Sequence, residues 1–248
     1  DYYIVFDSDC IIPADYFQIV DNFLDENQLD AFGGPDAALD SFTIVQKAIS
    51  YSMTSFFTTG GIRGGNKPLE KFRPRSFNMG ISKEVFERTG GYLITRMGED
   101  IEFSIRIEKA GFRTGLIPDA KVYHKRRTKL GEFYKQLFFF GRGRINIFRF
   151  YKSELKVVHL LPLFFVLGLF FWLSTSIWNW QLFQMGAALI ALYYILIGID
   201  AFMKTQNFFV ACLSLVTSFI QLFAYGMGFI KESFTYLKHP KPAGLGHS

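Results

Sequence analysis

Two aspartates stand two positions apart, directly after an apolar run near the start of the sequence. The run 2–6 is typical of a buried strand, and Asp7 and Asp9 follow it. Carboxylates with this spacing can converge on one ligand across a tight turn. Such a pair suits Mg²⁺ or Mn²⁺ carrying a diphosphate, because these hard cations prefer oxygen ligands. A plain Asx-turn is the alternative, since aspartates are common where strands end.

A second acidic pair precedes a helical pattern further along the chain. Glu99 and Asp100 come just before isoleucines with helical spacing, and Gly111 predicts the end of that helix. The helix macrodipole favours an ionised carboxylate at such a position. An ordinary N-cap role for Asp100 is the alternative.

Alternating strand and helix patterns surround both acidic pairs and indicate an α/β domain. Strand patterns fall at residues 2–6, 31–32, 77–81, 112–117 and 120–124. Helix patterns fall at residues 13–24, 41–57, 83–89 and 101–110. Ser82 is a favourable N-cap for the third of these helices, and Gly90 predicts its end.

The composition predicts a membrane-bound protein. Half of the 248 residues are hydrophobic, and apolar residues are densest after Val157. We therefore expect a globular part of roughly 150 residues, followed by helices of about 20 apolar residues that cross a bilayer. Three apolar segments, at residues 157–178, 182–203 and 208–230, satisfy this length. Cys10 and Cys212 are the two cysteines, which indicates a reducing compartment rather than a disulfide framework.

Basic residues predict how the chain meets the membrane. Arginines and lysines are concentrated between Lys125 and Lys156, which places the globular part in the cytoplasm by the positive-inside rule. Aromatic residues interleave with these charges at helical spacing, which favours membrane lipid over nucleic acid as the partner. Three full crossings would leave Lys231 outside, so the third segment is a candidate for a re-entrant or interfacial helix. Asp200 is expected to reach the interface by snorkelling.

Together these motifs give the sequence a resemblance to the family-2 glycosyltransferases, which are inverting enzymes of the GT-A fold. The resemblance covers residues 1 to about 150 and keeps the order of the family's motifs. It is carried by residues 4–9 (IVFDSD), residues 77–86 (FNMGISKEVF) with residues 90–92 (GGY), residues 98–100 (GED) and residues 118–124 (PDAKVYH).

The resemblance implies a partial GT-A domain, Rossmann-like and specific for nucleotide-diphospho-sugars, followed by C-terminal transmembrane helices. The family's first half, which binds the nucleotide base, is not represented here, so we expect it upstream of Asp1 in the native protein. The predicted organisation is the C-terminal part of the GT-A domain at 1–130, an amphipathic interfacial helix and linker at 131–156, the transmembrane region at 157–231 and a tail at 232–248.

The resemblance also implies roles for particular residues. Asp9 is expected to be the main ligand of Mg²⁺ or Mn²⁺, together with Asp7, and His124 is either a further ligand or a structural residue. Asp100 is expected to be the general base that deprotonates the acceptor hydroxyl, while Glu99 shapes the acceptor site or positions Asp100. The donor diphosphate is expected to contact Asp7, Asp9, Arg75, Asn78, Arg142 and Arg144. For the last two arginines, binding to lipid headgroups is the alternative.

The sequence therefore predicts a metal-dependent inverting glycosyltransferase in the inner (cytoplasmic) membrane, multi-pass, with its catalytic part in the cytoplasm. It would move a sugar from a nucleotide-sugar donor to a membrane-associated acceptor, such as a lipid-linked saccharide, in the synthesis of a cell-envelope polysaccharide. The Gln-x-x-Arg-Trp motif of processive synthases is not met, because Gln136 is followed by Leu-Phe-Phe-Phe-Gly-Arg. A processive synthase with a diverged motif is one alternative, and a non-catalytic membrane scaffold or lipid-binding module is the other.

Overall fold

The computed structural model describes residues 1–37, 41–59, 72–94 and 96–240, and these residues form two compact units. The first unit contains residues 1–37, 41, 72–94 and 96–125, and the second contains residues 42–59 and 126–240. The sequence analysis assigned residues 42–59 to the first domain, whereas here they pack with the C-terminal helices. The hydroxyl of Thr217 donates a hydrogen bond to the carbonyl of Ala48 at 3.0 Å, deep inside the second unit.

A four-stranded mixed sheet forms the centre of the first unit. Its order is β1 (Tyr2–Phe6), β5 (Asn78–Ser82), β3 (Ala31–Gly33) and β6 (Thr114–Leu116). Strand β5 is antiparallel to β1 and to β3, whereas β3 and β6 are parallel. The carboxyl ends of β1, β3 and β6 therefore lie at one edge of the sheet, where β5 begins.

Strand β1 is present with the predicted bounds, but the prediction that it is buried is wrong. Tyr2, Tyr3 and Val5 are all exposed. The physical reason is the position of the strand, because β5 is its one neighbour in the described part of the sheet.

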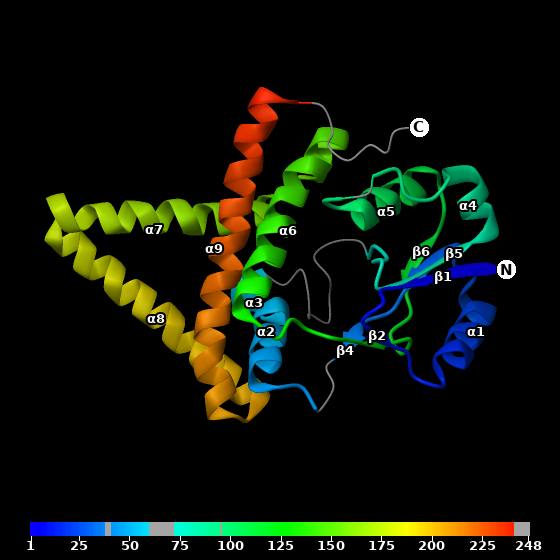
Figure 1. Ribbon diagram of the computed structural model, residues 1–248, viewed down its shortest axis with the longest axis horizontal. Coiled ribbons are helices and arrows are strands. Elements are labelled where there is room, and N and C mark those ends of the chain that lie inside the picture. The colour runs from blue at the N-terminus through cyan, green and yellow to red at the C-terminus, as the bar shows by residue number, and fades with distance from the viewer. Residues whose placement is uncertain (38–40, 60–71, 95, 241–248) are drawn as a thin grey trace. The chain divides into compact units, whose positions relative to one another are not determined.

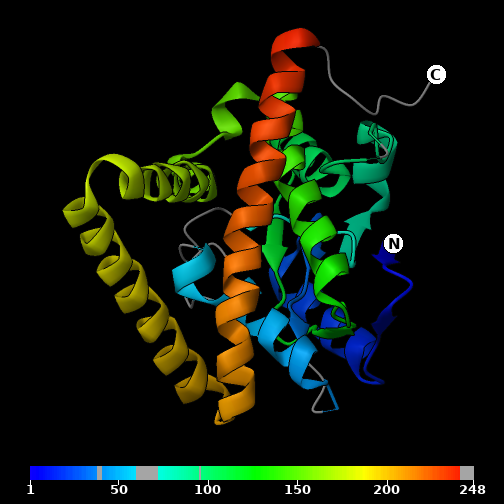
Figure 2. The same ribbon diagram turned by 60° about the vertical axis from the view of Figure 1, so that its left-hand side comes forward.

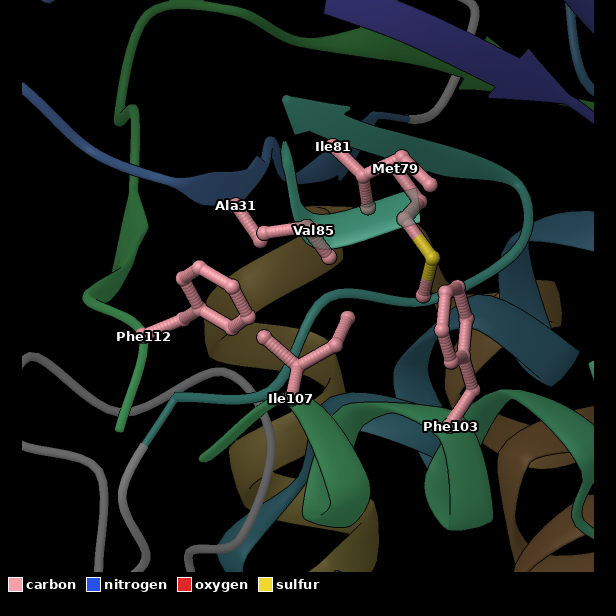
Figure 3. Packing of buried hydrophobic residues seen from close by; sticks show 7 residues of the cluster. All are labelled: Ala31, Met79, Ile81, Val85, Phe103, Ile107 and Phe112. Atoms are coloured by element: carbon pink, nitrogen blue, oxygen red, sulfur yellow. The ribbon is translucent and has the colours of Figure 1, made fainter. Parts of the chain in front are cut away.

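Helices cover both faces of this sheet (Figure 1). Helix α1 (Tyr16–Asn27) lies on one face, and α4 (Lys83–Thr89) and α5 (Glu99–Lys109) lie on the other. The core under α1 contains Tyr16, Val20, Phe32, Ile117, Ala120 and Val122. The core under α4 and α5 contains Ala31, Met79, Ile81, Val85, Phe103, Ile107 and Phe112 (Figure 3). Gly80 leaves space for the ring of Phe32, since a Cβ at position 80 would lie 2.1 Å from that ring.

Helix α4 begins and ends as the sequence predicts. The hydroxyl of Ser82 accepts a hydrogen bond from the backbone N–H of Val85, which caps the first turn. Gly90, with φ of 72°, ends the helix in the left-handed conformation that glycine adopts readily.

A second, three-stranded sheet continues from the carboxyl edge of the first. Its order is β2 (Cys10–Ile11), β7 (Val122–His124) and β4 (Asp36–Ala37). Strands β2 and β4 have two residues each and show no periodic signal in the sequence. In this sheet the segments that follow β1, β3 and β6 pair with one another.

The second unit is helical. It comprises α2 (Ile44–Thr54), α3 (Phe56–Thr59), α6 (Leu130–Phe150), the short 3₁₀ turns at Lys152–Glu154 and Val157–Leu160, α7 (Leu161–Trp178), α8 (Trp180–Thr205) and α9 (Phe208–Lys238). Helices α6 and α9 lie side by side in both views (Figure 1, Figure 2). Glycines bring these two helices close, because a Cβ at Gly141 would lie 2.0 Å from the carbonyl oxygen of Tyr225.

Three helical segments in the described part of the chain are long and apolar enough to cross a membrane. They are Val157–Trp178, Trp180–Thr205 and Phe208–Lys238. The predicted apolar segments are therefore confirmed as helices. The structure describes all of residues 208–238, and they form one unbroken helix, so the re-entrant turn considered for the third segment is not present there.

Asp200 has two partners within the second unit. Its carboxylate accepts hydrogen bonds from the hydroxyl of Tyr51 at 2.7 Å and from the ammonium of Lys204 at 3.0 Å. The Tyr51 hydroxyl in turn accepts a hydrogen bond from Ser55. These contacts join α2 to α8, and the sequence did not predict them.

Candidate active site

The first acidic pair lies in the turn that leaves the carboxyl end of β1. The backbone N–H of Cys10 donates to the carbonyl of Asp7 at 3.0 Å and closes this turn. The backbone N–H of Lys125 donates to the carbonyl of Asp9 at 3.2 Å. Strand pairing sets Cys10 opposite His124, so the backbone of His124 lies beside the turn. Three predicted site positions thus meet at one edge of the sheet.

Cys10 lies among carboxylates at this edge and is partly buried. Burial, and then the charges of Asp7 and Asp9, raise the pKa of the Cys10 thiol to about 11. Asp36, on β4, adds to the same effect. Sequence reasoning missed Asp36, although its place after the Gly-Gly-Pro turn that follows β3 is a comparable strand-end signal.

The second acidic pair occupies the first turn of α5. The residues before it, Met97 and Gly98, both have left-handed backbones, with φ of 64° and 103°. Such a conformation costs a non-glycine residue about 1–3 kcal/mol and is common where a site positions side chains. The N-cap is Gly98, so the alternative that Asp100 is the N-cap is wrong. The Asp100 Oδ1 accepts instead from the N–H of Ile101 at 2.8 Å.

Arg75 lies close to Asp100. Its Nη1 is 3.6 Å from the Asp100 Oδ2, and the two side chains are 24% and 20% exposed. Arg75 stands just before β5, where its carbonyl accepts a hydrogen bond from the N–H of Asn78 at 2.9 Å. The structure therefore brings one predicted donor-binding residue to the predicted base.

Asn78 is placed inside the protein. Its side chain is fully buried, and its Oδ1 accepts a hydrogen bond from the hydroxyl of Tyr16 at 2.5 Å. Its Nδ2 donates to the carbonyl of Ala120 at 2.7 Å. The amide thus joins α1, β5 and the segment after β6, so Asn78 supports this edge of the sheet from within.

Tyr92 lies near both acidic pairs. In the sequence it stands out only as part of the Gly-Gly-Tyr motif at residues 90–92. Burial, and then the charges of Asp100, Asp7 and Glu99, raise the pKa of its phenol to about 12. The Tyr92 hydroxyl lies 3.7 Å from the Sδ of Met79, which pairs with Val5 just before Asp7, and the Tyr92 ring packs on Phe103, one turn of α5 after Asp100. Charges from two different elements therefore converge on one side chain.

Arg142 and Arg144, the two arginines of α6 predicted to bind the donor, belong to the second unit, and the acidic residues belong to the first. The Nε of Arg142 pairs with the Glu232 carboxylate of α9 at 2.8 Å. Arg149 pairs with the same carboxylate at 2.8 Å, and both Arg149 and Glu232 have side chains only 1% exposed. Arg144 is half-buried on the same helix.

The acidic edge of the first unit has the oxygen ligands that a divalent cation needs. Within the residues that the structure describes, no group of three or more Asp, Glu, His or Cys side chains is arranged to hold a metal on its own. Mg²⁺ is commonly bound by one or two carboxylates, with substrate phosphates and water completing its coordination. Asp7 and Asp9 fit this second arrangement.

Comparison with known proteins gives one informative similarity. No family model matches the chain. The chain is 27% identical over 141 residues to the succinoglycan biosynthesis protein ExoA of Rhizobium meliloti (strain 1021). The aligned region covers 56% of this chain and 42% of that relative, so the chain spans less than half of the relative's length.

Proposed function

We propose that the chain is part of a membrane-bound, inverting glycosyltransferase that works in polysaccharide biosynthesis. The observation that carries this proposal is the placement of both acidic pairs beside Tyr92: Asp7 follows the strand that pairs with Met79, on which the Tyr92 hydroxyl lies, and Glu99 and Asp100 open the helix on which its ring packs. The similarity to a succinoglycan biosynthesis protein supports it, since a polysaccharide is built by sugar transfer. The three apolar helices support action at a membrane. Membership of family 2 and the GT-A fold are part of the proposal.

Asp7 and Asp9 would hold Mg²⁺ or Mn²⁺ against the diphosphate of a nucleotide-sugar. The bound cation would supply charge stabilisation for the departing diphosphate. His124 would stand beside them, because its backbone pairs with Cys10. Arg75 has a planar guanidinium suited to phosphate oxygens, and it lies at the same edge.

Asp100 would take the proton of the attacking hydroxyl. Its Oδ1 is fixed by the N–H of Ile101, its Oδ2 faces Arg75 across 3.6 Å, and the side chain as a whole is partly exposed. Proton transfer to this oxygen lets the acceptor oxygen form its bond to the anomeric carbon as the bond to the diphosphate breaks on the opposite side. This single displacement inverts the anomeric centre.

The remaining predicted residues would support the reaction. The Glu99 carboxylate accepts from the N–H of Gly98 at 3.1 Å, so it fixes the turn that presents Asp100. Asn78 would maintain the edge of the sheet from within. For the arginines of α6, a place near the membrane favours lipid headgroups as the ligand of Arg144, while Arg142 is held by Glu232.

Transfer assays on the full-length protein in membranes test this proposal. Labelled UDP-glucose, UDP-galactose and GDP-mannose would each be offered, and label in the lipid-extractable fraction would be measured. We expect transfer from at least one donor, loss of transfer with EDTA, and recovery with excess Mg²⁺ or Mn²⁺.

Two variants serve as the contrast in this assay. Asp9→Asn should reduce transfer at least tenfold, as expected when a ligand of a catalytic cation is lost. Asp25→Asn, on the exposed surface of α1, should not change it. Lipid binding without any sugar transfer, indifferent to Asp9→Asn, would favour the membrane scaffold instead.

A further inference from the structure

The turn that contains Tyr92 accepts hydrogen bonds from Arg106 of α5, and Arg106 also forms an ion pair with the buried Glu102. Gly90 and Gly91 both have positive φ, at 72° and 74°. The guanidinium of Arg106 donates to the carbonyl of Gly91 at 2.5 Å and also to the carbonyl of Thr89. Arg106 is itself held by Glu102 at 3.0 Å, and the Glu102 side chain is 1% exposed.

Helix α5 therefore positions two parts of the site at once. Its first turn presents Glu99 and Asp100, and its next turns hold the Tyr92 segment through Arg106. The ring of Tyr92 also packs on Phe103 of the same helix, with a centroid distance of 5.1 Å. The position of Tyr92 relative to Asp100 is thus set by one rigid element.

The hydroxyl of Tyr92 is suited to donate to a substrate. Its partner in the structure is the Sδ of Met79 at 3.7 Å. A thioether is a weak acceptor, so a sugar oxygen can displace it at little cost. The Tyr92 residue is 39% exposed, which leaves it accessible from the solvent side. The phenol is protonated near neutral pH, since burial, and then the charges of Asp100, Asp7 and Glu99, raise its pKa to about 12.

The location of Tyr92 indicates which part of the substrate it would meet. In a single displacement the anomeric carbon lies between the base and the departing diphosphate. Asp100 marks the side of the base, and Asp7 marks the side of the diphosphate. The Tyr92 hydroxyl lies beside Met79, which pairs with Val5 two positions before Asp7, and the Tyr92 ring packs on Phe103, one turn of α5 after Asp100. Tyr92 therefore borders the space in which the transferred sugar must lie.

We propose that Tyr92 is a specificity-determining residue that contacts the transferred sugar of the donor, with its hydroxyl donating a hydrogen bond to a hydroxyl oxygen of the sugar. Arg106 and Glu102 act as positioning residues, since they hold the turn and do not touch the sugar. This inference rests on the proposed glycosyltransferase function and names one contact within it.

Tyr92→Phe separates a sugar contact from a structural role. The variant keeps the ring on Phe103 and removes the oxygen. It would be compared with Tyr3→Phe, which changes a half-exposed tyrosine of β1 that packs on Phe86. With the full-length protein, kcat/KM would be measured for whichever of UDP-glucose, UDP-galactose and GDP-mannose is transferred. Dissociation constants for the matching nucleoside diphosphate, which has no sugar, would be measured with Mn²⁺.

The expected result is a fall of about tenfold in kcat/KM for Tyr92→Phe, the effect of one hydrogen bond. Affinity for the nucleoside diphosphate and the thermal midpoint should stay unchanged, and Tyr3→Phe should match the unchanged protein. Equal loss for the sugar donor and the nucleoside diphosphate would overturn the inference, as would no loss at all. Failure of the unchanged protein to transfer sugar from any of the three donors would overturn the proposed function, and this inference with it.

Discussion

Asp100 has one carboxylate oxygen that accepts from a backbone N–H and one that faces a cation. Ile101 donates to the first, and Arg75 lies 3.6 Å from the second. This arrangement restricts the rotation of the carboxylate, and the side chain is 20% exposed. A general base needs this kind of directed, accessible oxygen.

Asp100→Asn should therefore lower sugar transfer by about 10²–10⁴-fold, the usual contribution of a general base. The amide has the same shape and can still accept from Ile101, so folding and donor affinity should be retained. Turnover and donor KM would be measured on the full-length protein, with Asp25→Asn as the surface control. Normal turnover by Asp100→Asn would show that another group is the base.

At the scale of elements, the crossing of α6 and α9 depends on close backbone approach beside a buried ion cluster. Gly141 leaves no room for a side chain, since its Cβ would lie 2.0 Å from the carbonyl oxygen of Tyr225. In the same pair of helices, the Glu232 carboxylate forms ion pairs with two arginines, Arg142 and Arg149. Removing one partner from a buried ion pair is costly, so this cluster requires the two helices to keep their register.

Gly141→Ala should destabilise the protein by about 1–3 kcal/mol, because the added methyl group meets backbone atoms that cannot move aside. Gly131→Ala is the matched control on the same helix, where a Cβ meets nothing within 4 Å. That control should be neutral or slightly stabilising, since alanine favours helix more than glycine does. Thermal unfolding in detergent would compare them. Equal midpoints for the two variants would contradict the tight crossing.

At the scale of the whole molecule, the three apolar helices predict an integral membrane protein. Much of the surface of α7 and α8 consists of exposed large hydrophobic side chains, such as Leu167, Phe171 and Leu189, which suit contact with lipid tails. The basic residues before α7 predict that the first unit faces the cytoplasm.

The protein should stay in the membrane fraction after alkaline carbonate washing and should be released by detergent. Protease added to inverted vesicles should cleave the first unit, whereas protease added to intact spheroplasts should leave it protected. Immunoblotting with an antibody against residues 72–94 would follow the fragment. Cleavage in intact spheroplasts would place the first unit outside and would contradict the positive-inside assignment.

The sequence by itself determined the features that depend on neighbouring residues. Strand β1, the Ser82 cap, the Gly90 stop and the apolar helices all arise from local periodicity or from one side chain bonding to a nearby backbone group. The positions of the acidic pairs after a strand and before a helix were equally predictable. Each of these depends on contacts within one or two turns of the chain.

The tertiary structure alone decided which distant residues meet. It exposed β1 by giving it one described neighbour, buried Asn78 against Tyr16 and Ala120, and packed Tyr92 against Met79 and Phe103. It also joined Tyr51 to Asp200, which are 149 positions apart. Such contacts follow from strand order and helix packing, which depend on the free energy of the whole fold and leave no periodic trace in the residues that make them.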